Sequence, residues 1–255
     1  MGALHHGHIE LVHSAFSHSK IVVVSIFVNP TQFNNEEDLI RYPRTLKRDT
    51  ALLKTVGNVV VFAPAVGEMY PNEFTEINLE LGILDKVMEG LYRPGHFKGV
   101  MNVVNRLFEI VKPDYGLFGV KDFQQLVVIK FMVNSFNVGV KIISCDTVRE
   151  ASGLASSSRN NLLSASDLNK AIMIIETLKH AKELASKFKP EEVVRLAKKH
   201  FSKGHLKLEY LTIVDPQSLE ELKLWVPGSR MCIAAYCSGI RLIDNIELLD
   251  EDGIS

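Results

Sequence analysis

The N-terminal residues combine histidine and glycine at a spacing that suits phosphate chemistry. Residues 1–8 read Met-Gly-Ala-Leu-His-His-Gly-His and lead directly into an amphipathic helical pattern that starts at Ile9. A glycine-containing loop that opens a helix directs unpaired backbone N–H groups and the positive end of the helix dipole at one point. His5 and His8 are three residues apart, so both imidazoles can face that point and donate to phosphate oxygens. The segment predicts a polyphosphate site, although a surface histidine pair without function gives the same pattern.

A second set of polar residues follows an apolar, strand-like run. Lys121 and Asp122 lie between an expected strand at 115–118 and an expected helix at 124–136. Ligands of open α/β sheets bind beyond the carboxyl ends of the strands, where this pair would lie. A Lys-Asp pair at a helix start is more often only a helix cap, so a functional role for these two residues needs further support.

A third candidate segment is polar and has the composition of a loop. Residues 150–161 are rich in serine, asparagine and glycine. Within them, Ser157 and Ser158 supply two hydroxyl groups and Arg159 supplies a planar guanidinium of fixed charge. Such a segment between two domains can close over a triphosphate, so we expect residues 148–160 to act as a hinge and lid.

Composition restricts the possible ligands and compartments. The chain has 255 residues and a formal net charge of −1, which gives no reason to expect nucleic acid or a membrane surface as a partner. A small-molecule ligand is therefore expected. The cysteines Cys145, Cys232 and Cys237 are few, odd in number and set in apolar runs, which argues against a disulfide framework. No apolar run reaches the roughly 18 residues of a membrane helix, so we expect a soluble, cytoplasmic protein.

The elements that must position these residues alternate between strand and helix as far as residue 147. The run at 21–28 is a continuous β-branched stretch, which is typical of a parallel strand buried on both faces. The alternation indicates an α/β domain with a parallel, Rossmann-like sheet. Its remaining expected strands are 59–62, 115–118 and 140–145, and its later helices are 46–56, 98–111 and 124–136.

The pattern changes after Arg149, which indicates a second domain. Two helices at about 166–188 and 190–203 are divided by Pro190, and three strands follow near 208–214, 230–236 and 241–246. That order fits a small α+β domain. We therefore expect a Rossmann-like, ligand-binding domain at 1–147 and a smaller lid domain at 148–255.

Several blocks of sequence resemble one known family. H-x-G-H at a helix start is similar to the signature of the HIGH superfamily of nucleotidyl transferases, and M-G-A-L-H-x-G-H narrows the resemblance to the pantothenate synthetase (pantoate–β-alanine ligase) family. Further blocks occur in that family's order over nearly the whole chain. These blocks are Phe27–Phe33, Tyr42–Thr45, Arg93–Phe97, Lys121–Gln125, Val148–Glu150, Ser157–Asn160 and Arg241–Asn245.

The resemblance implies an activity and its ligands. It implies ATP-dependent condensation of pantoate with β-alanine through a pantoyl-adenylate intermediate, giving pantothenate, AMP and pyrophosphate. ATP would be a substrate, Mg²⁺ would accompany its phosphates, and a homodimer would form through the first domain. Two alternatives stay open from the sequence: a related nucleotidyltransferase, and a nucleotide-binding homologue with impaired catalysis.

The resemblance also implies roles for individual residues, although it assigns none as a metal ligand. The expected catalytic residues are His5, His8, Lys121, Ser157, Ser158 and Arg159. The expected nucleotide-binding residues are Met1, Gly2, Ala3, Leu4, His5, His6, Gly7, His8, Gly119, Val120, Lys121, Asp122, Val148, Ser156, Ser157, Ser158 and Arg159. The expected substrate-binding residues are Asn29, Gln32, Phe33, Arg93 and Gln125.

Three points depart from this pattern or allow two interpretations. The family carries a strand before the first glycine-containing loop, and this sequence starts at that loop, as a truncated chain or one whose start is assigned too late. Val120 stands where the family often has Glu, which puts a polar contact beside Lys121 in doubt. Asp49 could assist Mg²⁺ or cap a helix, and we favour the cap; the His6 side chain is expected to face solvent.

Overall fold

The computed structural model describes residues 1–33 and 36–249, and the chain divides into two compact units. Unit 1 comprises Met1–Val120 and Gln124–Asp146, and unit 2 comprises Lys121–Phe123 and Thr147–Ser255. The short segment Lys121–Phe123, which we expected within the first domain, thus groups with the C-terminal part of the chain. The functional division at 147/148 stays a prediction, and residues 250–255 of the expected lid domain lie outside the described residues.

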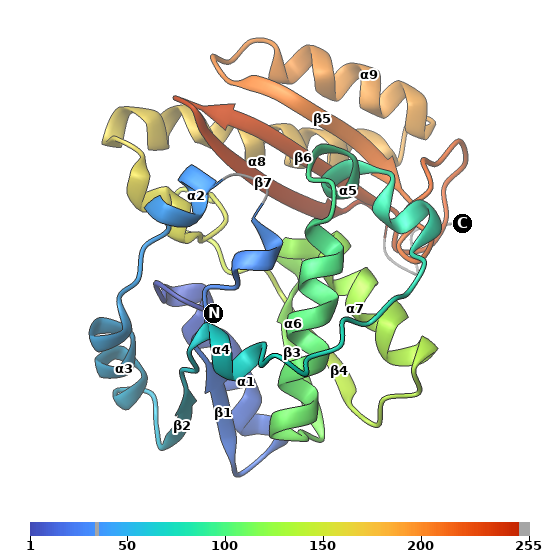
Figure 1. Cartoon of the computed structure of the whole chain (residues 1–255). Helices are drawn as coiled ribbons and strands as arrows, with labels where there is room; N and C mark the ends of the chain where they lie inside the picture. The colour runs from blue at the N-terminus through green and yellow to red at the C-terminus, as the bar shows by residue number, and fades with distance from the viewer. Residues whose placement is uncertain (34–35, 250–255) are drawn as a thin grey trace. The chain divides into compact units, whose positions relative to one another are not determined.

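Unit 1 is built from parallel strands separated by helices. β1 (Val22–Ser25) pairs with β2 (Val59–Phe62), and β3 (Tyr115–Gly119) pairs with β4 (Lys141–Cys145), each in parallel (Figure 1). Parallel neighbours need a crossover, which helices supply here. The expected parallel α/β architecture is confirmed, with two two-stranded sheets among the described residues. The other elements of this part of the chain are α1 (His6–His18), η1 (Pro30–Gln32), α2 (Glu36–Arg41), α3 (Leu46–Lys54), α4 (Val66–Met69), η2 (Gly82–Asp85), α5 (Met88–Tyr92), α6 (His96–Val111), η3 (Val120–Asp122) and α7 (Phe123–Ser135).

The expectation that the 21–28 run is buried on both faces is wrong. Val22 and Val24 are buried, whereas Val23 is 36% exposed and Ile21 is 74% exposed. The buried valines pack against the apolar sides of α1 and α3, which cover one face. A continuous β-branched run cannot reveal that the second face is open, because both situations favour the same residues.

The free edge of β1 is occupied at one point by the first residue. The Met1 amino group donates to the Ser25 carbonyl at 2.9 Å, and the Phe27 N–H donates to the Met1 carbonyl at 2.9 Å. These two bonds continue the ladder beside β1 and fix where the N-terminal loop begins.

Helix α6 fixes the loop that follows β1. Its apolar residues recur at helical spacing and are buried, among them Phe97, Val100 and Val104. Gly99 faces η1 so closely that a Cβ there would overlap the Thr31 carbonyl oxygen. Only glycine allows this approach, so the α6 surface holds the Asn-Pro-Thr-Gln turn in place.

Unit 2 contains an antiparallel sheet covered by two long helices, and the sequence indicated the two helices and the three strands but not the strand direction. β5 (Lys207–Val214), β6 (Arg230–Cys237) and β7 (Ile240–Glu247) lie in that order. α8 (Ala165–Ala185) packs on β6 and β7, and α9 (Pro190–Phe201) packs on β5 (Figure 1). The Ser164 hydroxyl caps α8 by accepting from the Asp167 N–H at 3.1 Å. η4 (Ser158–Leu162) precedes α8.

The described residues include no helix with the length and apolar character that crossing a bilayer requires. Cys145, Cys232 and Cys237 are free cysteines, and the last two are buried.

Candidate active site

The start of α1 brings His5 and His8 together. His5 is the N-cap residue, with an extended backbone at φ −134° and ψ 175°. Its N–H donates to Nδ1 of His8 at 3.3 Å, and the two ring centroids are 4.0 Å apart. An Nδ1 that accepts a hydrogen bond carries no proton, so neutral His8 presents its Nε2–H as a donor. His6, by contrast, is exposed and lies 3.9 Å from Glu10, as expected of a solvent-facing side chain.

A buried aspartate holds the loop that precedes these histidines. Asp49 is 1% exposed, and its two carboxylate oxygens accept from the N–H groups of Ala3 at 3.0 Å and Leu4 at 2.9 Å. The Thr45 hydroxyl also donates to it, at 3.0 Å. Ala3 has φ 48°, a left-handed conformation that costs a non-glycine residue about 1–2 kcal/mol. The carboxylate therefore holds a strained loop.

The contacts of Asp49 match neither Mg²⁺ binding nor simple helix capping, the two roles expected from the sequence. The sequence did contain one indication that Asp49 is buried. Asp49 and Leu53 are four apart in α3, so the aspartate lies on the buried, apolar side of that helix. A carboxylate there needs partners, and those partners come from 45 and 46 residues earlier in the chain.

The turn after β1 is organised by Asn29. This residue is 2% exposed, and its amide donates to the Gly99 carbonyl at 3.1 Å and to Gln32 Oε1 at 3.4 Å. Its Oδ1 accepts from the Tyr70 hydroxyl at 2.8 Å. Burial raises the pKa of Tyr70, so that hydroxyl stays protonated and remains a donor. Asn29 thus orients the amide of Gln32, and its expected substrate contact stays a prediction.

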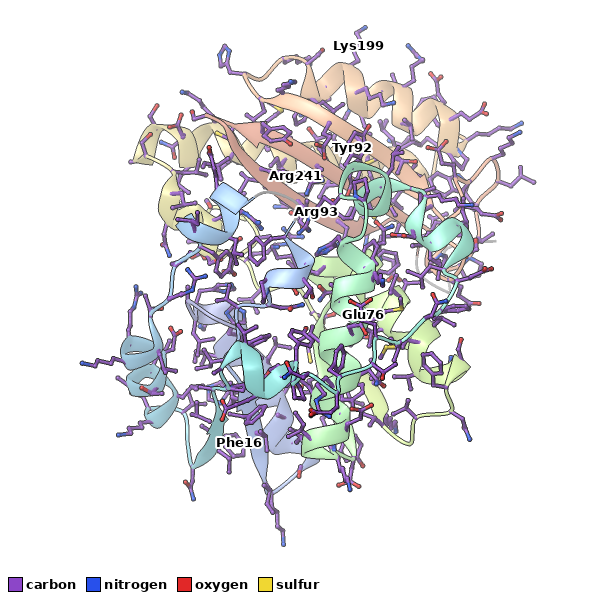
Figure 2. The ribbon with its side chains drawn as sticks, in the orientation of Figure 1. Phe16, Glu76, Tyr92, Arg93, Lys199 and Arg241 are labelled. Atoms are coloured by element: carbon purple, nitrogen blue, oxygen red, sulfur yellow. The ribbon has the colours of Figure 1, made fainter. Side chains whose placement is uncertain are left out.

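Arg93 and His96 lie behind Gln32 and hold its backbone. Nδ1 of His96 is 3.0 Å from the Gln32 carbonyl oxygen, and Nη1 of Arg93 is 3.1 Å from Nε2 of His96. A carbonyl only accepts and a guanidinium only donates, so His96 is neutral with its proton on Nδ1. Arg93 also donates to the same carbonyl at 3.4 Å. Figure 2 labels Arg93, which directly follows α5. Arg93 therefore helps to position Gln32, and its expected contact with substrate stays a prediction.

The two glutamines at the start of α7 have different surroundings. Gln124 is 4% exposed; it accepts from the Glu89 N–H at 2.8 Å and donates to two carbonyls of the 84–87 segment. Gln125 beside it is half-buried. Gln124 is therefore structural, and Gln125 is the one with surface to offer a ligand. Phe33, a further expected substrate residue, stacks edge-on against Tyr42 at 5.5 Å.

Lys121 and Asp122 belong to unit 2. Nζ of Lys121 lies 3.8 Å from Oδ1 of Asp122, and the side chains are 20% and 49% exposed. Gly119 ends β3, and Val120 lies in η3 without offering a polar side chain. The pair is arranged to present one cation and one carboxylate at the start of α7.

The Ser-rich segment is an ordered hairpin in the same unit. The Ser156 N–H donates to the Val148 carbonyl at 2.9 Å, and its hydroxyl donates to Glu150 at 2.6 Å. Ser157 caps η4 by accepting from the Arg159 N–H at 3.3 Å. Ser158 is 9% exposed and Arg159 is half-buried. The hairpin leads directly into the start of η4, which carries two hydroxyls and a guanidinium, and their contact with a triphosphate stays a prediction.

Each unit thus carries its own group of candidate donors to polyphosphate. Unit 1 contributes two imidazoles and the helix start, and unit 2 contributes Lys121, Arg159 and two serines. Within the described ranges, no three His, Cys, Asp or Glu side chains gather in a way that could hold a metal ion. The donor sets suit anionic oxygens in both units.

Comparison with known proteins identifies the family. The family model described as pantoate-beta-alanine ligase matches residues 1–247. The pantothenate synthetase of Bacteroides fragilis is 44% identical over 250 residues, covering 97% of this chain and 88% of that protein. That of Porphyromonas gingivalis is 45% identical over 253 residues, with 98% and 90% coverage.

Solved structures agree with the sequence comparison. The pantothenate synthetase of Thermus thermophilus has a TM-score of 0.93 and 43% identity, covering 97% of this chain and 91% of that one. The pantoate-beta-alanine ligase of Francisella tularensis, complexed with beta-gamma ATP and beta-alanine, has a TM-score of 0.79 and 36% identity, with 97% and 87% coverage. The chain therefore belongs to the pantoate–β-alanine ligase family.

Proposed function

We propose that this ATP-dependent ligase joins pantoate to β-alanine in two steps, through an enzyme-bound pantoyl adenylate. In the first step a pantoate carboxylate oxygen attacks the α-phosphorus of ATP, and the bond to pyrophosphate breaks. In the second step the β-alanine amine attacks the acyl carbon, AMP leaves and the nitrogen loses a proton. The observation that best supports the proposal is the pairing of His5 and His8 at the start of α1, where Nδ1 of His8 accepts from the His5 N–H.

In unit 1, the histidines and the helix start act on charge that grows on the phosphates. His8 donates from Nε2, and His5 lies beside it at the positive end of the α1 dipole. One well-placed donor in a dry site contributes about 3 kcal/mol to transition-state stabilisation, or roughly 100-fold in rate. Nucleotide contacts are proposed for Met1, Gly2, Ala3, Leu4, His5, Gly7 and His8, and for the backbone alone of His6, whose side chain is exposed.

In unit 2, Lys121 and Arg159 supply fixed positive charge, and Ser157 and Ser158 supply hydroxyl donors. Phosphoryl-type transfer depends mainly on positioning and electrostatic stabilisation, so these groups need no covalent role. Gly119, Val120, Asp122, Val148 and Ser156 are proposed to line the nucleotide site.

Pantoate binding is assigned to Gln32 and Gln125. An amide both donates and accepts, which suits a ligand that carries hydroxyl groups and a carboxylate. Asn29, Arg93 and His96 favour this assignment because their contacts fix the backbone and the amide of Gln32. Phe33 packs at the end of the same turn.

Mg²⁺ fits this chain as an ion held chiefly by the substrate's phosphates. Both oxygens of Asp49 already accept hydrogen bonds, and no metal-binding cluster occurs among the described residues. When bound, the ion would neutralise charge on the triphosphate. A homodimer and a cytoplasmic location are proposed from the family and the balanced charge of the chain.

The test is isotope exchange between labelled pyrophosphate and ATP. If pantoate is activated first, exchange requires pantoate and Mg²⁺ but no β-alanine. Exchange that occurs only when β-alanine is present would overturn the adenylate order. A nucleotidyltransferase or an inactive homologue would fail to release AMP when acid and amine are both supplied.

A further inference from the structure

Two adjacent polar residues of β7 are buried and have no part in the proposed chemistry. Asp244 and Asn245 are each 3% exposed. Successive residues of a strand point to opposite faces of the sheet, so the two side chains serve different surroundings. Burial of an unpaired polar group costs free energy, so buried polar side chains are nearly always hydrogen-bonded. The hydrogen-bond partners of Asp244 and Asn245 therefore show which segments β7 fixes in place.

Asp244 holds the hairpin that carries the serines. Its two oxygens accept from Nη1 and Nη2 of Arg149 at 2.7 and 3.1 Å. The same guanidinium donates to the Gly153 carbonyl at 3.1 Å. Arg149 thus links the start of the hairpin, where it lies, to the turn at Gly153. A bidentate guanidinium–carboxylate pair fixes orientation as well as distance. The backbone that leads into Ser157 is thereby tied to β7.

Asn245 holds the segment that carries Lys121. Its Nδ2 donates to the Lys121 carbonyl at 2.9 Å, and its Oδ1 accepts from Nη1 of Arg230 at 2.8 Å. A guanidinium only donates and a carbonyl only accepts, so the amide has one orientation here. Arg230 also lies over the Phe123 ring at 4.8 Å and pairs with Glu247 at 2.7 Å.

We propose that Asp244 and Asn245 are positioning residues for the ligase reaction, which act through the hairpin and through Lys121 respectively. All of these contacts lie within unit 2. One rigid strand sets the backbone of both groups of phosphate donors, so the serines, Arg159 and Lys121 keep a fixed mutual geometry. Such geometry matters because a donor displaced by about 1 Å can cost 10²-fold in rate. The inference rests on the roles proposed above for Lys121 and Ser158.

A residue that only stabilised the fold would behave differently in a double-mutant cycle. If Asn245 only stabilised the fold, the rate losses of the two single variants would be independent. The double variant would then show the product of the two losses. If Asn245 acts through Lys121, removing Lys121 first leaves Asn245 nothing to position, and the effects do not multiply. The same logic applies to Asp244 with Ser158.

The experiment measures pyrophosphate exchange for Asn245→Ala, Lys121→Ala and the double variant. We expect Asn245→Ala to lower kcat about 10-fold with the KM for pantoate unchanged, and to cost less than about twofold when Lys121→Ala is already present. Asp244→Asn with Ser158→Ala should show the same lack of multiplication. If Asn245→Ala is too unstable to purify, Asn245→Ser is used, since its short hydroxyl cannot span to the Lys121 carbonyl.

Tyr236→Phe is the matched control. It removes the partly buried bond from the Tyr236 hydroxyl to Glu209 at 3.0 Å, a carboxylate that also binds Arg241 of β7. The substitution touches neither the hairpin nor Lys121, so it should lower Tm and leave kcat unchanged.

The outcomes separate the two claims. If Lys121→Ala leaves exchange unaltered, the role proposed for Lys121 is wrong and the Asn245 inference is overturned with it. If Lys121→Ala slows exchange but Asn245→Ala does not, or if the two effects multiply, the positioning inference alone is overturned. A loss of kcat in Tyr236→Phe equal to that in Asn245→Ala would also overturn it.

Discussion

The two units fix their candidate phosphate-binding residues by different means. In unit 1 a single carboxylate, Asp49, holds the N-terminal loop through two backbone N–H groups. In unit 2 two neighbouring residues of one strand hold the hairpin and Lys121 through side chains and carbonyls. In unit 1 the position of the loop thus depends on one side chain, whereas in unit 2 the positions of the hairpin and of Lys121 depend on several hydrogen-bonded side chains.

The two loops also differ in backbone strain. The N-terminal loop places an alanine, Ala3, at φ 48°, whereas the hairpin of unit 2 turns at Gly153, with φ 88°. Glycine adopts this conformation at no steric cost, but alanine does not. The unit 1 loop therefore depends more strongly on its anchor, and removing Asp49 should affect it more than one lost bond affects the hairpin.

The largest expected effect tests the unit 1 histidines. His8→Ala should lower pyrophosphate exchange about 100-fold or more, because a donor to charge developing on the phosphates is lost. Little loss of stability is expected. Exchange rates at saturating substrate provide the measurement.

His6→Ala is the matched control for His8→Ala. His6 belongs to the same helix start, yet its side chain is exposed and contacts Glu10 rather than His5 or His8. Its replacement should change exchange less than about twofold. Equal activity of the two variants would mean that the histidine assignment is wrong.

A smaller effect is expected at the anchor of the same loop. Asp49→Asn leaves one oxygen acceptor where two loop N–H groups need partners, so we expect exchange to fall about 10-fold and unfolding free energy to fall by about 1–3 kcal/mol. Exchange kinetics and chemical denaturation measure the two effects. Asp114→Asn, at an exposed aspartate of the same unit, is the control. Full activity of Asp49→Asn would remove Asp49 as the residue that sets the His5 and His8 geometry.

Local patterns predicted most of the elements in both units. The spacing of Val100, Val104 and Phe108 indicated α6, and Pro190 divided α8 from α9 as expected. Such signals depend on residues a few positions apart, which sequence shows directly. The sequence also indicated the histidine pair, because its two members are three apart.

The anchors could not be predicted in the same way. Asp49 binds residues 45 and 46 positions earlier, and Asn245 binds a carbonyl 124 positions earlier. Backbone N–H and C=O groups are identical in every residue, so nothing in the sequence marks which ones a buried side chain will meet. The contact of Arg93 with the Gln32 carbonyl also joins a side chain to a distant backbone group, so it appeared only in the structure. The exposed second face of β1 likewise depends on which distant elements cover the strand.

The hairpin of unit 2 should respond to ligand. If Ser157, Ser158 and Arg159 contact the triphosphate, the amides of 152–160 should exchange hydrogen severalfold more slowly when ATP and pantoate are added. Hydrogen–deuterium exchange with peptide resolution measures this. The amides of β6, which lie in the core of the same unit, serve as the internal control. Unchanged exchange at 152–160 would contradict a lid at this segment.

The smallest expected effect concerns unit 2 at acid pH. His200 on α9 stacks on His180 at a centroid distance of 4.6 Å. Burial, followed by the charges of His180 and Lys203, lowers the pKa of His200 below its usual 6.5, and Glu176 opposes the shift. The folded state therefore disfavours the charged ring. The stability that this difference contributes is complete above pH 6.5 and is lost as the pH falls from there towards the lower folded pKa.

His200→Gln removes this titration. The Tm of the unaltered chain should therefore fall more steeply than that of His200→Gln as the pH drops below 6.5, by an amount on the order of one or two degrees. His205→Gln, at an exposed histidine just beyond α9, should follow the unaltered chain. Parallel Tm profiles for His200→Gln and the unaltered chain would mean that the half-buried His200 ring is not what makes unit 2 sensitive to acid.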